Sequence, residues 1–223
     1  MSSRTAWPLC EIEASSADLV EPVRRRLGWW VEHPAEHARF LNTLALMEHI
    51  GSRKIMVSQT KGVLSQEILK HLAEETRHSF FFKRAAEAIA QRTLEFNDDD
   101  ALRPGAAKMY FGRLDASIAQ VLPADVHPEV PYLYVSLTIE LRAIWTYELY
   151  QQELAARPGR FSLKSVLAEE ELHLSQMVDR LHQLDARPET LVSTFAQRED
   201  RLFRGFWASL EQACERSSAD AAA

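Results

Sequence analysis

The chain has 223 residues and a formal net charge of −6; 46% of its residues are hydrophobic and 26% are charged. This composition is typical of one globular domain with a substantial core, and it excludes a disordered chain. The negative charge, with no long Lys/Arg run, argues against a nucleic-acid partner. No apolar run reaches the roughly 18 residues of a membrane span, and no secretory signal is visible.

The two cysteines, Cys10 and Cys214, lie near opposite ends of the sequence and form neither a disulfide framework nor a CxxC pair. We therefore expect a reducing, cytoplasmic environment. Only seven glycines occur, whereas Ala, Leu, Glu and Arg are abundant. This usage favours helix, and no segment has the pattern of a strand.

Caps and breakers divide the sequence into helical segments. Residues 1–14 are expected to be an irregular lead-in, and residues 93–130 a long connection that contains one short helix. The dipeptides His33-Pro34, Pro158-Gly159 and Arg187-Pro188 each predict the end of a helix. The predicted helices cover about residues 15–32, 35–57, 65–92, 106–121, 131–156, 162–185 and 190–215.

Two copies of one short motif dominate the pattern. Glu75-Thr76-Arg77-His78 and Glu170-Glu171-Leu172-His173 each place a Glu three residues before a His. On a helix these two side chains share a face, and the apolar residues before each motif predict that this face is turned to the core. A buried carboxylate costs several kcal/mol unless it is paired or bound to a metal. The repeated motif therefore predicts an ion cluster.

A third acid joins the first motif. Glu48 interrupts the apolar stripe of the helix over residues 35–57. The midpoint between Glu48 and Glu75 falls in the turn at Gln59-Thr60-Lys61-Gly62, so an antiparallel helix pair would bring both acids to one level. His71 lies one turn before Glu75 on the same face. We assign it to the core or the surface, with a supporting contact to the metal ligands as the alternative.

The equivalent acid on the helix over residues 131–156 is either Glu140 or Glu148, which share a face. Aligning the two Glu-x-x-His motifs places the counterpart of Glu48 nearer Glu140. Hairpin geometry favours Glu148, because the midpoint between it and Glu170 falls at Pro158-Gly159. Glu140 is slightly preferred, and both stay open.

This order of two Glu-x-x-His helices, each paired with a Glu-bearing helix, resembles the ferritin-like di-iron carboxylate superfamily. The resemblance implies an all-α ferritin-like four-helix bundle, made of two antiparallel helix pairs joined by the long crossover over 93–130. The bundle core would cover about residues 35–185 of a single domain, 1–223. Additional helices over about 15–32 and 190–215 would flank it.

The resemblance also implies the ligands of two metal ions. Glu75 and Glu170 would bridge the ions, while His78 and His173 would each bind one. Glu48 and a third-helix Glu would complete the set. The implied cofactor is two iron ions, with manganese or a mixed manganese and iron pair as alternatives. The candidate metal ligands are Glu48, Glu75, His78, Glu140, Glu148, Glu170 and His173.

Such a centre implies an oxidoreductase that activates O₂ or peroxide on a small molecule and draws electrons from an external donor. No catalytic residue beyond the metal ligands is assigned. The alternatives are iron oxidation and storage, as in ferritins, or a non-catalytic helical scaffold. For a scaffold or a homodimer, the candidate contact surfaces are Trp29-Trp30 and the C-terminal residues Phe203, Phe206 and Trp207.

Overall fold

The computed structural model describes residues 3–58, 65–157 and 161–220, and this part of the chain is all-α. It contains eight α-helices and one short 3₁₀ helix, and no strand occurs within it. None of the helices in these ranges is both long enough and apolar enough to cross a membrane. The elements are α1 (Ser3–Ser15), η1 (Ala17–Leu19), α2 (Val20–Glu32), α3 (Pro34–Ser58), α4 (Gln66–Ala90), α5 (Pro104–Ala119), α6 (Glu129–Ala155), α7 (Lys164–Gln183) and α8 (Pro188–Asp220).

The seven predicted helices are confirmed, and most of their ends fall within a few residues of the predicted positions. The expected lead-in over residues 1–14 is wrong, because α1 occupies most of it. Leu9 and Ile12, three residues apart on α1, are both buried. Their burial stabilises a helix that the local sequence, with Pro8 inside it, does not indicate. The predicted turns at 59–62 and 158–159 lie outside the described residues.

The chain divides into two compact units. The first comprises Met1–Leu27 and Gly112–Leu202, and the second comprises Gly28–Phe111 and Phe203–Ala223. The single-domain organisation expected from the sequence stays a prediction, as does the four-helix bundle. Each unit is described below by itself.

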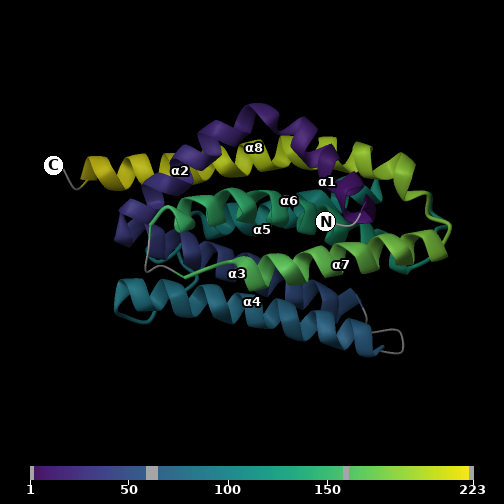
Figure 1. Cartoon of the computed structure of the whole chain (residues 1–223), viewed down its shortest axis with the longest axis horizontal. Helices are drawn as coiled ribbons and strands as arrows, with labels where there is room; N and C mark the ends of the chain where they lie inside the picture. Colours follow the sequence, from purple (N-terminus) through teal and green to yellow (C-terminus); the bar gives the residue numbers. More distant parts are fainter. Residues whose placement is uncertain (1–2, 59–64, 158–160, 221–223) are drawn as a thin grey trace. The chain divides into compact units, whose positions relative to one another are not determined.

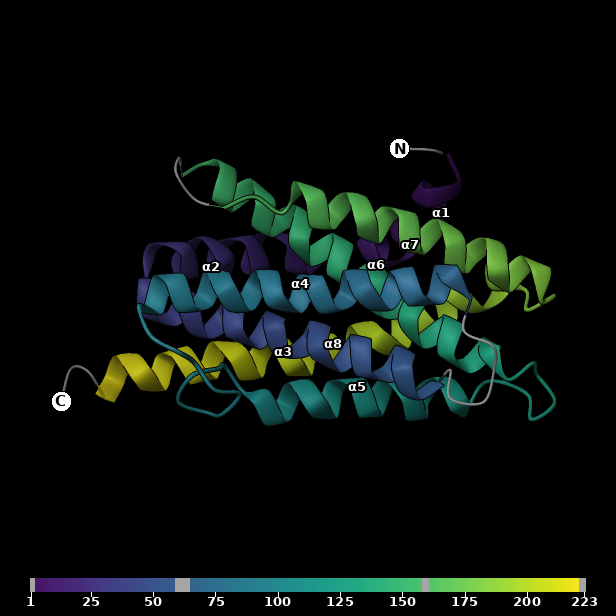
Figure 2. The same ribbon diagram turned by 90° about the horizontal axis from the view of Figure 1, so that it is seen from below.

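In the second unit, α3 and α4 run side by side, as Figures 1 and 2 both show. Ser65 caps α4, where its hydroxyl accepts a hydrogen bond from the amide of Ile68. Near the middle of the pair, Ser79 Oγ donates to the carbonyl oxygen of Ala45 at 2.8 Å. This bond fixes the register of the two helices close to Glu48 and His78.

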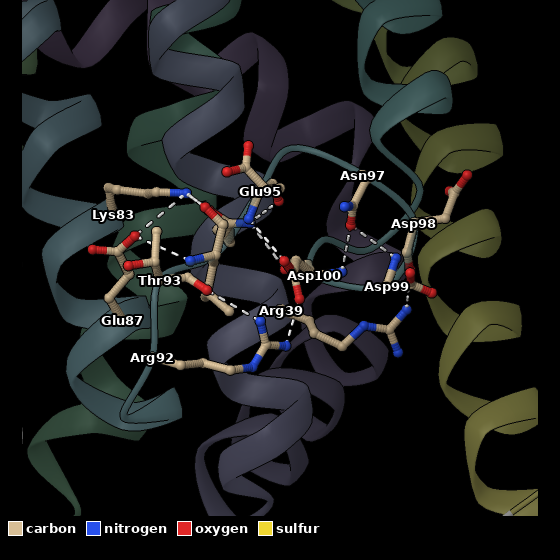
Figure 3. A network of polar contacts seen from close by, with 12 residues as sticks. Arg39, Lys83, Glu87, Arg92, Thr93, Glu95, Asn97, Asp98, Asp99 and Asp100 are labelled. Atoms are coloured by element: carbon tan, nitrogen blue, oxygen red, sulfur yellow. Dashed lines mark hydrogen bonds and ion pairs between the residues drawn. The ribbon is translucent and has the colours of Figure 1, made fainter.

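A polar network anchors the loop that follows α4 (Figure 3). The Asp100 carboxylate pairs with the Arg92 guanidinium and accepts from the amide of Glu95 at 2.8 Å. Buried Asn42, on α3, donates to the carbonyls of Glu95 and Asp100 at 2.8 and 2.9 Å. Lys83 Nζ, on α4, donates to Asn42 Oδ1 at 3.0 Å. The loop after α4 is thus tied to both helices of the pair.

The C-terminal aromatic residues do not form the exposed contact surface expected from the sequence. Phe203, Phe206 and Trp207 are all buried, and Trp30 is fully buried. Trp30 packs edge-on against Trp207, with ring centroids 5.4 Å apart, and Tyr110 stacks on Phe206 at 5.4 Å. These aromatic rings cover one another and so form part of the core of the second unit.

In the first unit, α7 lies against α6, and contacts at both ends of the pair hold them together. At one end, Tyr134 Oη donates to the carbonyl of Ala186 at 2.6 Å, and burial raises the pKa of this phenol. At the other end, Gln151 Oε1 accepts from the amide of Leu163 at 2.6 Å. These contacts set the level at which the side chains of α6 and α7 meet.

A buried ionic network also lies in the first unit. Arg142, on α6, forms two hydrogen bonds through Nε and Nη2 to the Glu199 carboxylate, at 3.0 and 2.7 Å. Its Nη2 also donates to Ser16 Oγ at 3.0 Å, and Ser16 in turn donates to Asp200 at 2.8 Å. The guanidinium lies 4.9 Å from the ring centroid of Trp145. All four polar side chains are buried, so the network connects the N-terminal segment, α6 and α8 in the interior.

Candidate metal centre

The second unit brings three predicted ligands together in its interior. Glu48 on α3 and Glu75 and His78 on α4 are all buried. One ligand atom from each lies within 4.8 Å of those of the other two. The prediction that Glu48 and Glu75 sit at one level is therefore confirmed. Two carboxylates and an imidazole this close are sufficient to hold a metal ion.

His71 extends this group along α4. Its Nε2 lies 3.4 Å from Glu75 Oε1, while Nδ1 of His78 lies 4.0 Å from the same oxygen. The side chain of His71 is 12% exposed. The sequence placed His71 on the correct face but assigned it to the core or the surface. The sequence feature that indicates its position beside Glu75 is the spacing of His71, Glu75 and His78, at i, i+4 and i+7 on one helix face.

Gly51 gives the Glu75 carboxylate its space. It lies one turn after Glu48 on α3, and a β-carbon built on it would be 3.1 Å from Glu75 Oε2. Most side chains at this position would press on the carboxylate. A glycine inside a helix costs about 1 kcal/mol relative to alanine. Its presence next to Glu75 fits a site in which that carboxylate must keep its position.

The first unit carries the other predicted ligands. Glu140 on α6 and Glu170 and His173 on α7 are buried. Ligand atoms of Glu140 and His173 lie within 4.8 Å of each other. Nδ1 of His173 lies 3.0 Å from Glu170 Oε2. The second Glu-x-x-His motif thus points its acid and its imidazole into the interior, with an acid of α6 nearby.

Glu148, the alternative to Glu140, has different surroundings. Its side chain is half-buried, and it belongs to neither of the ligand groups found among the described residues. Burial and the negative charges of Glu13 and Glu171 raise the pKa of its carboxyl. Hairpin geometry favoured Glu148 because it assumed that the α6 acid lies level with Glu170. Glu140 lies near His173 instead, and the midpoint of that pair falls close to the end of α6.

The donor set of both units consists of carboxylates and imidazoles, with no thiolate among the grouped residues. Such ligands suit iron or manganese, whereas structural zinc sites usually use cysteine. Glu75 lies between Gly51 and the two histidines of α4, so the residues present fit a bound cation.

We compared the chain with protein-family models, with curated proteins and with solved structures, and found no match in any of the three. The resemblance to the ferritin-like superfamily therefore rests on the sequence motifs and their order alone. Within the residues that the structure describes, which are all-α, buried acidic and histidine side chains lie close enough to hold a metal ion.

Proposed function

We propose that this chain is a metal-dependent oxidoreductase with a carboxylate-bridged pair of iron or manganese ions. The ligands would come from both Glu-x-x-His helices and from their partners α3 and α6, as in a ferritin-like bundle. Such a pair of ions binds and activates O₂ or peroxide. The substrate would be a small molecule, and an external donor would supply electrons.

One observation supports this proposal most strongly. Glu48, Glu75 and His78 come from two helices and place their ligand atoms within 4.8 Å of one another in a buried position. Bringing two carboxylates together away from water is costly unless a cation or a proton compensates their charge. A bound metal ion provides that compensation and also explains why an imidazole lies beside them.

The protein's own residues have three roles in this proposal. Glu75 and Glu170, the acids of the two motifs, would each bridge the ions, while His78 and His173 would each ligate one. Glu140 is preferred over Glu148 as the α6 ligand, because it is buried near His173. The apolar core around these groups would exclude water and limit which molecules reach the ions.

The test is the metal content of the purified chain, together with its optical spectrum in air and after addition of peroxide. About two iron ions per chain and an absorption band that changes with peroxide would support the proposal. Manganese in the same amount would support peroxide chemistry. A chain that takes up neither metal after reconstitution would refute it.

Two matched pairs of variants locate the binding. Glu75→Gln and His78→Gln should abolish uptake of at least one ion. Glu74→Gln and His49→Ala should leave it unchanged, since Glu74 pairs with Lys70 and His49 is exposed on α3. Full metal uptake by Glu75→Gln would show that the ions bind elsewhere.

A further inference from the structure

Three of the predicted metal ligands lie within one compact unit. Glu48 on α3 and Glu75 and His78 on α4 all belong to the second unit, and each offers a ligand atom within 4.8 Å of those of the other two. All three side chains are buried. Two carboxylates and one imidazole fill three coordination positions of an iron or manganese ion, and water can take the others. This set is therefore sufficient for one ion without a side chain from the first unit.

The second unit also holds these ligands in place through its own contacts. Ser79 Oγ, next to His78 on α4, donates to the carbonyl of Ala45 on α3 at 2.8 Å. A β-carbon on Gly51 of α3 would lie 3.1 Å from Glu75 Oε2, so α3 restricts where this carboxylate can lie. Both contacts join α3 to α4. The geometry of the three-ligand set therefore depends on a helix pair that lies within one unit.

The first unit offers a less complete set of ligands. Glu140 and His173 place ligand atoms within 4.8 Å of each other, and His173 Nδ1 lies 3.0 Å from Glu170 Oε2. Among the described residues of this unit, however, no three acidic, histidine or cysteine side chains bring one ligand atom each within 4.8 Å of one another. Gathering these three side chains around one ion would require them to move, and such reorganisation lowers the affinity.

We infer that the two ions bind in a fixed order. The set of Glu48, Glu75 and His78 takes the first ion tightly, and the second ion, which needs ligands of the first unit, binds more weakly. This inference rests on the proposed function and deepens it, because it names how the centre is regulated. At a low concentration of free metal the chain holds one ion, and chemistry that needs two ions waits for the second. The supply of iron or manganese thus controls the activity.

Titration of the metal-stripped chain with cobalt(II) under anaerobic conditions tests this order. Visible absorption and equilibrium dialysis give the number of bound ions and the affinity for each. Hydrogen–deuterium exchange shows which helices the first ion protects. Wild type should bind two ions, the first at least about 10-fold more tightly than the second. One equivalent of cobalt should slow exchange in α3 and α4 and leave α6 and α7 as in the metal-free chain.

Variants assign each binding step to a unit. His78→Gln should weaken the binding of the first ion at least about 10-fold. Glu48→Gln should act in the same way, and it removes a buried charge rather than an imidazole. His173→Gln should keep the first step and weaken only the second. His49→Ala, which changes an exposed histidine on α3, should bind both ions like wild type. Thermal unfolding without metal confirms that each variant is folded.

The possible results distinguish this inference from the proposed function. A wild-type chain that binds no cobalt refutes both. One ion in wild type, weakened in His78→Gln and kept in His173→Gln, supports the site in the second unit but refutes the two-ion centre. Two ions of equal affinity overturn the order and leave the proposed function intact. So does a first ion that His173→Gln loses and His78→Gln keeps, or one that protects α6 and α7 as much as α3 and α4.

Discussion

Gly51 and Glu75 approach so closely that a β-carbon on Gly51 would lie 3.1 Å from Glu75 Oε2. This relationship joins the two helices that carry Glu48, Glu75 and His78. An added methyl group must displace the carboxylate by a few tenths of an ångström. The position of the Glu75 carboxylate, on which both α4 histidines converge, thus depends on the absence of a side chain on α3.

Gly51→Ala should therefore weaken metal binding while changing stability little. Alanine gains about 0.5–1 kcal/mol over glycine in a helix, and crowding of Glu75 should offset part of this gain. We expect cobalt(II) affinity to fall about 10-fold, as it does when a group that orients a ligand is altered. Cobalt titration and thermal unfolding of the metal-free chain measure the two effects.

Gly205→Ala is the matched control. Gly205 lies in α8 and is exposed, and a β-carbon there would meet no atom within 4 Å. It should show the full gain in stability and bind cobalt like wild type. If both variants are stabilised equally and bind cobalt equally well, the close approach of Gly51 has no consequence for the site.

Glu140→Gln and Glu148→Gln should have opposite consequences. Glu140 is buried near His173, so its neutralisation should weaken the binding of one ion. Glu148 is half-buried, and its ionisation is opposed by burial and by Glu13 and Glu171. Glu148→Gln should therefore leave metal binding intact. If Glu148→Gln weakens the binding of one ion and Glu140→Gln does not, then Glu148 rather than Glu140 is the α6 ligand.

The raised pKa of Glu148 also predicts how the stability of the fold should change with pH. A carboxyl whose pKa is higher in the folded than in the unfolded chain favours folding at low pH, and this advantage is lost as the pH rises through the folded pKa. At pH 7 the ionised group is therefore slightly destabilising. Glu148→Gln should therefore raise the Tm slightly at pH 7, and solvent screening of this half-exposed group keeps the gain small. The gain should disappear below pH 4, where wild type is protonated as well.

The sequence predicted most of the helices. It also predicted that Glu48 lies close to Glu75 and His78. Both predictions depend on local signals in the sequence. α2 ends at Glu32, directly before His33-Pro34, and α3 and α8 begin at Pro34 and Pro188, because a proline fixes its own φ and restricts the residue before it. The common level of Glu48 and Glu75 follows from equal distances to a turn. Such features need no knowledge of distant parts of the chain.

The features that the sequence did not predict depend on distant partners. Arg142 is 57 residues from Glu199 and 126 from Ser16, and nothing in its own segment marks it as buried. The α1 helix forms where local propensity is weak. The aromatic residues near the C-terminus were assigned to a surface because hydrophobic side chains alone do not reveal what covers them.

Arg142→Met should destabilise the chain strongly. It would leave the fully buried Glu199 carboxylate without the guanidinium that compensates its charge. Removing one partner of a buried ion pair typically costs about 3–5 kcal/mol. Urea unfolding of the metal-free protein measures the loss. The double variant Arg142→Met with Glu199→Leu should lose less than the two single variants together, because no buried charge remains unpaired in that pair.

Arg24→Met is the control for this prediction. Arg24 pairs with Glu153 at 3.2 Å, but its side chain is 40% exposed. Such a pair contributes at most about 1 kcal/mol. Equal losses in Arg142→Met and Arg24→Met would mean that the buried network contributes no more than a surface ion pair does.

Asp100→Asn should loosen the loop after α4 in a manner that depends on pH. The hydrogen bond from Arg92 and the amide of Glu95 lower the pKa of the Asp100 carboxyl below its ordinary value of 3.8. A carboxyl with a lowered pKa in the folded chain adds stability above its ordinary pKa and loses it as the pH falls through the folded value. At pH 7, Asp100→Asn should therefore lower the Tm, because the hydrogen bonds from Arg92 and from the amide of Glu95 no longer reach a charged carboxylate.

The gap in Tm between wild type and Asp100→Asn should narrow below pH 4, as the wild-type carboxylate becomes protonated. Asp98→Asn is the control, because the Asp98 side chain is exposed and its contact with Arg39 uses the backbone carbonyl. It should unfold like wild type at pH 7. If the Tm difference between wild type and Asp100→Asn stays constant from pH 7 to pH 3, the charge of Asp100 does not stabilise the loop. The polar network of Figure 3 would then hold equally well with a neutral side chain.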